Sequence, residues 1–98
     1  MFVILWRFQP ASGREREFER AYGPDGDWAR FFRTGPGYLG TDLLRGGDGA
    51  YITIDRWTDE ASYEGFRLSH RTRYEEIDRA CEELTDEEML LGRFSDPT

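Results

Sequence analysis

The stretch YLGTDLLRGGDGAYITIDRW, residues 38–57, contains two extended segments separated by a glycine-rich turn. Residues 38–45 and 50–57 are rich in β-branched and aromatic side chains, which favour strands. Residues 46–49 (GGDG) supply glycines that accept the positive φ angles of tight hairpins without steric cost. The stretch therefore predicts a β-hairpin in the middle of the chain.

The sequence on either side of this hairpin predicts five more elements. They are a strand over residues 2–8, a helix that opens at Ser12 and runs through about Tyr22, a second helical piece over 27–33, a long helical region over about 60–84 and a strand over 89–94. Ser12 and Glu15 have the spacing of a capping box, Asp27 is expected to cap the second piece, and Thr58 or Asp59 the long helix. Residues 95–98 are expected to fray.

The resulting order is β-α-β-β-α-β, with no internal repeat or linker in 98 residues. This order is typical of the ferredoxin-like arrangement. We therefore predict one domain over residues 1–98, of α+β class, in which helices cover one face of a four-stranded antiparallel sheet.

Both faces of that sheet are predicted to be apolar. In the first strand, Phe2 and Ile4 alternate with Val3 and Leu5, and the later strands show the same two-sided pattern. Because helices cover only one face, the other would be a large apolar patch in water. The simplest cover is the same face of a second copy, so we predict a homodimer through sheet-to-sheet packing.

Charge and composition exclude several classes of function. A net charge of −7 opposes nucleic-acid backbones and anionic membrane surfaces, and the absence of lysine excludes a side-chain Schiff base. One histidine and one cysteine provide no metal-ligand spacing, so no metal is expected. The apolar run FVILW is too short for a signal peptide or a membrane span, and the predicted location is the cytoplasm.

Two side chains stand out as candidates for chemistry. His70, the only histidine, falls in a helical apolar stripe with Tyr63, Phe66 and Tyr74. It could accept a proton near neutral pH and act as a base, and the alternative is a hydrogen-bonded histidine of the core. Asp55 shares a strand face with aromatic residues, which would raise its pKa and suit it to act as a general base.

The remaining polar residues in the strands have an ordinary structural explanation. Arg7 and Arg56 are expected on neighbouring strands, where they can pair with Asp42 and Asp55. The alternative is that they line a cavity beneath the helices.

Nearly the whole chain resembles the antibiotic biosynthesis monooxygenase (ABM) family. The resemblance is carried by PGYLG at residues 36–40, Asp55-Arg56-Trp57 at the end of a strand, the helix directly after it, and LGRF at residues 91–94. It implies a dimeric α+β barrel with a pocket between sheet and helices in each subunit.

The resemblance also implies two chemistries. Characterised relatives oxidise polycyclic phenols with O₂ and no cofactor, and a second branch cleaves haem with an Asn, a Trp and a His. Trp57 resembles that tryptophan, but the chain has no asparagine, and Phe66 stands where the histidine is expected. Haem cleavage is therefore not the prediction.

The expected function is cofactor-independent oxidation of a small aromatic substrate, and the alternative is a non-catalytic protein that binds a small molecule in the same pocket. The implied catalytic residues are His70, Asp55 and Trp57. The implied substrate-binding residues are Tyr63, Tyr74, Phe66, Arg7 and Tyr51.

Overall fold

A computed structural model describes residues 1–97 of the chain. Its elements, in order, are β1 (Phe2–Pro10), α1 (Glu15–Tyr22), α2 (Asp27–Phe32), β2 (Tyr38–Arg45), β3 (Tyr51–Trp57), α3 (Glu60–Ser69), α4 (Arg71–Cys81), the 3₁₀ turn η1 (Glu82–Leu84) and β4 (Thr85–Ser95). None of the helices in this part of the chain is long and apolar enough to cross a membrane.

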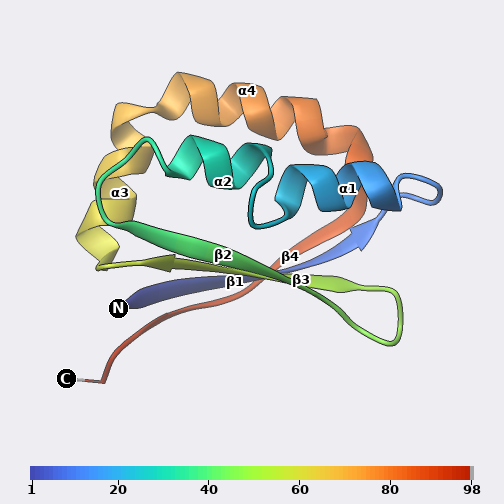
Figure 1. Ribbon diagram of the computed structural model, residues 1–98, viewed down its shortest axis with the longest axis horizontal. Coiled ribbons are helices and arrows are strands. Elements are labelled where there is room, and N and C mark those ends of the chain that lie inside the picture. Colours follow the sequence, from blue (N-terminus) through green and yellow to red (C-terminus); the bar gives the residue numbers. More distant parts are fainter. Residues whose placement is uncertain (98) are drawn as a thin grey trace.

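The four strands form one antiparallel sheet in the order β2-β3-β1-β4. Figure 1 shows all the helices in one layer above this sheet, with nothing on its lower face. The topology confirms the ferredoxin-like α+β prediction, because each helical segment returns the chain to the sheet on the same side.

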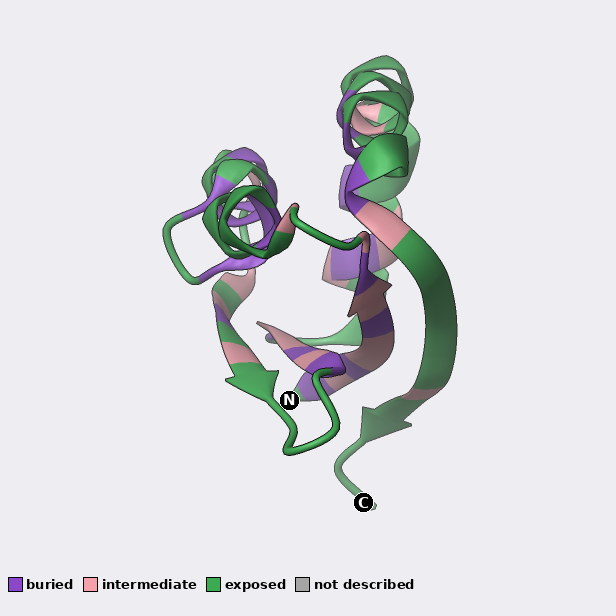
Figure 2. Ribbon diagram, turned by 90° about the vertical axis from the view of Figure 1, so that its right-hand side faces the viewer, coloured by how far each residue is buried: buried purple, intermediate pink, exposed green. Residues whose placement is uncertain are grey.

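The core lies between the sheet and the helices. On β1, Phe2, Ile4 and Phe8 are 2–3% exposed and face the helices, while Val3 and Leu5 face the other way and are only partly covered. Figure 2 shows this alternation as bands on the two central strands. The two faces follow from the period-two direction of strand side chains, as the sequence predicts.

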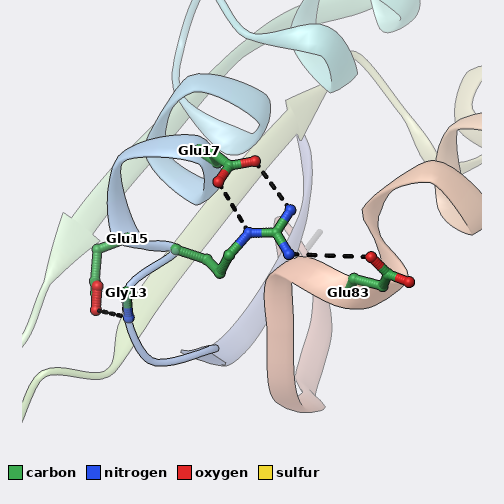
Figure 3. A network of polar contacts seen from close by, with 5 residues as sticks. Gly13, Glu15, Glu17 and Glu83 are labelled. Atoms are coloured by element: carbon green, nitrogen blue, oxygen red, sulfur yellow. Dashed lines mark hydrogen bonds and ion pairs between the residues drawn. The ribbon is translucent and has the colours of Figure 1, made fainter.

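The first helix begins differently from the prediction. Ser12 does not cap it: α1 starts at Glu15, with no side-chain hydrogen bond from its N-cap. The Glu15 carboxylate instead accepts a hydrogen bond from the Gly13 backbone, and Arg14 pairs with Glu17 and, at 4.0 Å, with Glu83 of η1 (Figure 3). The residue Gly13 has a φ of 82°, so the chain turns here and the helix starts later than a capping box at Ser12 would place it.

The second cap is also shifted by one residue. Gly26 occupies the N-cap of α2, and Asp27 is the first helical residue, where its carboxylate pairs with Arg30. A carboxylate in the first turn still interacts favourably with the helix dipole. Asp59 caps α3 as expected, because its side chain accepts a hydrogen bond from the Ser62 backbone at 2.7 Å.

The prediction of one continuous helix over residues 60–84 is wrong. The chain breaks at His70, between α3 and α4, where φ is −124° and ψ is 32°. The Phe66 carbonyl accepts from the His70 backbone N–H at 3.0 Å, and His70 Nδ1 lies 3.1 Å from the same oxygen. A side chain that satisfies a terminal carbonyl in this way favours a helix end over continuation.

The last strand is longer than the pattern of apolar residues indicates. It begins at Thr85, includes the acidic residues 86–88, and reaches Ser95. Asp96 is not frayed, since its carboxylate lies 2.7 Å from the amino terminus of Met1 and its backbone N–H donates to the Met1 carbonyl. Thr98, the last of the four residues expected to fray, lies outside the described residues.

Candidate functional site

A small cavity lies between the sheet and the helices, with a volume of about 40 Å³. A site of this size holds about one water molecule, and it is far below the roughly 300 Å³ at the lower end for ligand pockets. Six aromatic side chains and five polar ones line it: Trp6, Phe8, Tyr22, Trp28, Phe32, Tyr74, Thr41, Thr53, Asp55, Asp78 and Glu88. Aromatic side chains of the protein itself fill most of the space under the helices.

Asp55 is the acidic group on the sheet side of this cavity. It lies on β3 directly opposite Thr41 of β2, and its Oδ1 accepts a hydrogen bond from the Thr41 hydroxyl at 2.6 Å. Burial raises the pKa of Asp55 to about 6, and the Thr41 hydrogen bond only partly opposes that rise. No arginine is paired with this carboxylate in the described residues, so it can take up a proton near neutral pH.

The Thr41 hydroxyl is itself part of a longer chain of contacts. Tyr38 at the start of β2 places its hydroxyl 2.5 Å from Thr41 Oγ1. Removal from water raises the pKa of Tyr38. This phenol therefore stays protonated, and can donate a hydrogen bond, in the pH range around 6 where Asp55 titrates.

Two further acidic residues lie on the helix and β4 side of the cavity. Glu88 is exposed as a residue, but partial removal of its carboxylate from water, and secondarily the nearby Asp78 carboxylate, raise its pKa. Burial likewise raises the pKa of Tyr22 and of Tyr74, whose hydroxyls therefore remain neutral donors. The cavity thus combines acidic groups with phenols and carries no basic side chain in its lining.

Trp57 and Phe66 lie deeper in the core than the sequence indicates. Trp57 is 0% exposed and packs against Phe32, Tyr38, Tyr63 and Phe66 at ring-centroid distances of 5.3–5.6 Å. Its Nε1 is buried and has no hydrogen-bond partner in residues 1–97. Neither side chain lines the cavity in this structure.

Three other predicted site residues, Tyr63, Tyr51 and Arg7, lie away from the cavity that Asp55 borders. Tyr63 is buried against Phe2, beneath the guanidinium groups of Arg67 and Arg93. The Tyr51 hydroxyl donates a hydrogen bond to Glu19 of α1.

Arg7 points to the uncovered face of the sheet, where its guanidinium lies 3.5 Å from Asp48 and 3.8 Å from Glu87. The structure therefore does not bring Arg7 into the cavity. Arg56 pairs with Asp42 at 2.8 Å on the same open face, as expected for polar residues in a strand. Arg7 pairs with neither of the aspartates expected from the sequence, Asp42 and Asp55.

His70 lies in a different place from Asp55. Its ring stacks on Phe66 at a centroid distance of 4.4 Å and meets the edge of Phe31. It lines an open groove of about 610 Å³ on the outer side, between α2 and α4, together with Arg30 and Arg73. Of the predicted site residues, only Asp55 and Tyr74 meet in the inner cavity.

Sequence reasoning missed several residues around the cavity. Thr41 belongs to no motif, and Tyr38 belongs only to the PGYLG motif of residues 36–40. Pairing the strands outward from a turn over 46–49 places Thr41 opposite Ile54, whereas in the structure Arg45 pairs with Tyr51, which sets Thr41 opposite Asp55. Asp78 and Glu88 lie in a run of acidic residues over 75–88, a pattern typical of a solvated helix face, and the start of β4 has no apolar residue to mark it. No group of three His, Cys, Asp or Glu side chains in residues 1–97 is arranged to hold a metal.

Comparisons with solved structures show the same fold over essentially the whole chain. A variant of SnoaB, a cofactor-independent oxygenase from Streptomyces nogalater, is 25% identical with a TM-score of 0.72, and the match covers 99% of this chain and 93% of that one. Rv0793 from Mycobacterium tuberculosis is 17% identical, with a TM-score of 0.67 and coverage of 99% and 98%.

A third similar structure is a variant of MhuD with two manganese protoporphyrin IX molecules bound per active site. It is 18% identical, with a TM-score of 0.72 and coverage of 100% and 96%. At this identity the likeness shows the fold alone. Comparison with curated protein sequences gives no significant match.

The sequence model of one family, described as antibiotic biosynthesis monooxygenase, matches residues 1–74. The matched region runs from β1 into α4 and includes Asp55, Trp57 and the β2–β3 hairpin. Because it spans about three quarters of the chain, this protein belongs to the antibiotic biosynthesis monooxygenase family.

Proposed function

We propose that this protein is a cofactor-independent monooxygenase that oxidises a small aromatic or phenolic substrate with O₂, and that Asp55 is its general base. The observation that carries the proposal is the position of Asp55: a carboxylate at an aromatic cavity, with a hydroxyl donor and no cation beside it. Membership of the family and the likeness to the oxygenase SnoaB support the reaction class.

The chemistry needs a base more than it needs any other group. Deprotonation of a bound phenol or anthrone gives an electron-rich carbanion or phenolate that can pass an electron to O₂. In the oxidation of an anthrone, a CH₂ group becomes a carbonyl, with one oxygen atom of O₂ entering the product and the other leaving as water. A pKa of about 6 lets Asp55 accept the proton while most of the carboxylate is ionised at neutral pH.

Neutral hydroxyl donors near the base would bind the substrate oxyanion. Tyr74 and Tyr22 line the same cavity, and both keep their protons because burial raises their pKa. Donors that are already in place in a water-poor site stabilise developing negative charge strongly. Trp57 has a buried, unpartnered N–H two residues from Asp55, and it serves as a further donor if the pocket extends toward it.

The substrate must enlarge the cavity, since about 40 Å³ cannot hold an aromatic ring. The cavity lining includes Tyr74, which is only partly buried, and Asp78 and Glu88, which are exposed. Movement of these side chains at the α4 and β4 side opens the site with little loss of core packing.

The test uses O₂ consumption with a panel of anthrones and hydroquinones. Asp55→Asn should lower kcat/KM by about 10²–10⁴-fold, the usual contribution of a general base. His70→Ala is the control, because His70 lies in the outer groove, and it should retain turnover. The base assignment is wrong if Asp55→Asn keeps the wild-type rate, and the reaction class is wrong if the wild type consumes no O₂ with any member of the panel.

The small cavity favours a second candidate function, in which the protein binds a small aromatic molecule without transforming it. A pocket filled by its own side chains can bind a ligand by rearrangement and still lack the open volume for both substrate and O₂. Tryptophan fluorescence titration with the same panel separates the two: binding without O₂ consumption supports the second function.

We also propose that the protein is a homodimer in which the open faces of two sheets pack together. The open face carries Val3, Leu5, Ile52 and Ile54 at its centre, and the exposed Leu44, Met89 and Phe94 around them. A contiguous patch of this many large apolar side chains is typical of an interface. The fold expected for the antibiotic biosynthesis monooxygenase family is likewise a dimeric α+β barrel. Sedimentation at micromolar concentration should give a mass of two chains, and a stable monomer would contradict the proposal.

A further inference from the structure

A chain of hydroxyl groups connects Asp55 to the edge of the sheet. Thr41 has one hydroxyl hydrogen, and it donates that hydrogen to Asp55 Oδ1 at 2.6 Å. The 2.5 Å contact between the Tyr38 and Thr41 oxygens must then be a hydrogen bond donated by Tyr38. Tyr38, Thr41 and Asp55 thus form a single directed hydrogen-bonded chain.

An irregularity in β2 makes this chain possible. Tyr38 and Thr41 are three residues apart, so in a regular strand their side chains would point to opposite faces. The pairing with β3 shifts between Tyr38, which lies opposite Trp57, and Gly40, which lies opposite Arg56. The extra residue, Leu39, is 55% exposed, and it turns both hydroxyls to the helix-covered face, as a β-bulge does.

Gly40 supplies the backbone conformation that the bulge requires. Its φ of 145° lies in a region that residues with a side chain rarely adopt. β-Bulges that redirect side chains are common next to active sites, and this one lies beside the candidate base.

The two ends of the hydroxyl chain lie in different surroundings. At one end Asp55 borders the cavity, and Thr41 in the middle is only 8% exposed. At the other end Tyr38 is partly exposed, on β2, the edge strand of the sheet. The cavity's other acidic groups, Asp78 and Glu88, belong to α4 and to β4, the strand at the opposite edge.

We propose that Thr41 and Tyr38 relay the proton taken up by Asp55 to solvent at the β2 edge, while a substrate fills the cavity side. The inference rests on the proposed role of Asp55 as base. The proton on Asp55 passes to Thr41 Oγ1, the Thr41 hydrogen passes to the Tyr38 oxygen, and the Tyr38 hydrogen passes to water. Before this transfer the two hydroxyls rotate, so that Thr41 points its hydrogen at Tyr38 and Tyr38 points its own at water. After it, Thr41 again donates to Asp55 and Tyr38 to Thr41, and one net proton has moved from substrate to solvent.

The surroundings of the chain favour this route over the cavity. The titratable side chains around Asp55 are Tyr63 of α3 and, across the cavity, Tyr22, Tyr74, Asp78 and Glu88. Those around Tyr38 at the other end are Arg33, after α2, and Asp25, before it. None of these interrupts the two hydrogen bonds. On the cavity side, a bound substrate would displace the roughly one water molecule that the cavity holds and would separate Asp55 from the carboxylates of Asp78 and Glu88.

Three variants test the relay with minimal changes of shape. Tyr38→Phe removes only the terminal hydroxyl, Thr41→Val removes the middle one, and Thr41→Ser retains a hydroxyl at the same position. Tyr38 is the more exposed residue, so Tyr38→Phe carries the test alone if Thr41→Val does not fold.

The first readout needs no turnover. Exchange of the Asp55 carboxyl proton is measured by ¹³C NMR relaxation dispersion near pH 6, in protein saturated with a hydroquinone kept under anaerobic conditions or, if none binds, in the free protein. Tyr38→Phe and Thr41→Val should slow exchange by about ten-fold or more, and Thr41→Ser should stay close to the wild-type rate. A wild-type rate in either hydroxyl-deficient variant overturns the relay.

The second readout separates failure of the relay from failure of the proposed function. If the wild type consumes O₂, Tyr38→Phe should lower kcat with little change in KM and weaken the solvent deuterium isotope effect, because the remaining route no longer moves protons in concert. An unchanged kcat and isotope effect overturn the relay. A wild type without turnover contradicts only the oxygenase, and the exchange measurement still decides whether the hydroxyl chain carries protons.

Discussion

The two faces of the sheet carry similar numbers of apolar side chains, yet the structure treats them differently. On the covered face, Phe2, Ile4, Phe8 and Trp57 are 0–3% exposed, and the candidate base Asp55 lies among them. On the open face, Phe94 remains 53% exposed, and Arg7 and Arg56 pair with nearby carboxylates. The difference indicates that one face builds the core and the candidate site, whereas the other stays uncovered within a single chain and is the contact surface of the proposed dimer.

The largest expected effect comes from the same substitution made on each face. Phe8→Ala should lower the free energy of unfolding by about 3–5 kcal/mol at every protein concentration, since it leaves a cavity in the core. Phe94→Ala should cost less in a single chain, with a cost that grows as the protein concentration rises, because only association buries Phe94. Urea denaturation at several concentrations measures both. A concentration-independent cost for Phe94→Ala would contradict association through the open face.

The next effect concerns association itself. Ile54→Glu places a carboxylate at the centre of the open face and should convert a dimer to a monomer, because a buried unpaired charge is costly. Leu68→Glu is the matched control, since Leu68 is 67% exposed on α3, away from that face. Sedimentation velocity reports the mass of each. If Ile54→Glu sediments as the wild type does, the open face is not the contact between copies.

A smaller effect is expected from the acid on the covered face. The pKa of Asp55 is about 6, raised by burial from an ordinary value of 3.8, so the folded state binds its proton more tightly than the unfolded chain does. Its favourable contribution is complete below about pH 4 and is lost as the pH rises to 6, by roughly 2–3 kcal/mol. Relative to Asp55→Asn, the wild type should lose that stability between pH 4 and 7 in denaturant titrations.

The control for this measurement is a carboxylate with the opposite shift. The hydrogen bond from the Ser62 backbone lowers the pKa of Asp59, the cap of α3. Its contribution is present above its unfolded pKa and is lost as the pH falls, so the wild type should lose stability relative to Asp59→Ala toward acidic pH. Equal pH dependence in the wild type and Asp55→Asn would mean that the Asp55 pKa is not raised.

The smallest effect separates the bulge from the rest of the molecule. Gly40→Ala should cost about 1 kcal/mol or somewhat more, through backbone strain at a φ of 145°, because a Cβ there meets no atom within 4 Å. Gly65→Ala, inside α3 and also with open space around its Cβ, should instead stabilise by roughly 0.5–1 kcal/mol. Thermal unfolding compares them, and a stabilising Gly40→Ala would show that the bulge does not require glycine.

Much of the fold could be predicted from the sequence because its signals are local. The alternation on β1, the glycines at residues 46–49 and the Asp59 cap each act within a few residues, and each of these predictions is confirmed. The break at His70 could not be seen in the same way. The stripe around it keeps a helical spacing, whereas the non-helical backbone of His70 and the 3.1 Å approach of its ring to the Phe66 carbonyl are seen only in the structure.

The sequence by itself determined which residues could form strands and helices, that both sheet faces are apolar, and the family to which the chain belongs. Only the tertiary structure decided which polar groups meet. It placed Asp55 against Thr41, left His70 in an outer groove, and sent Arg7 to the open face. The physical reason is that periodicity fixes the direction of a side chain along its own element, whereas its neighbours depend on strand register and helix position. One extra residue at Leu39 is enough to change which hydroxyl faces the base.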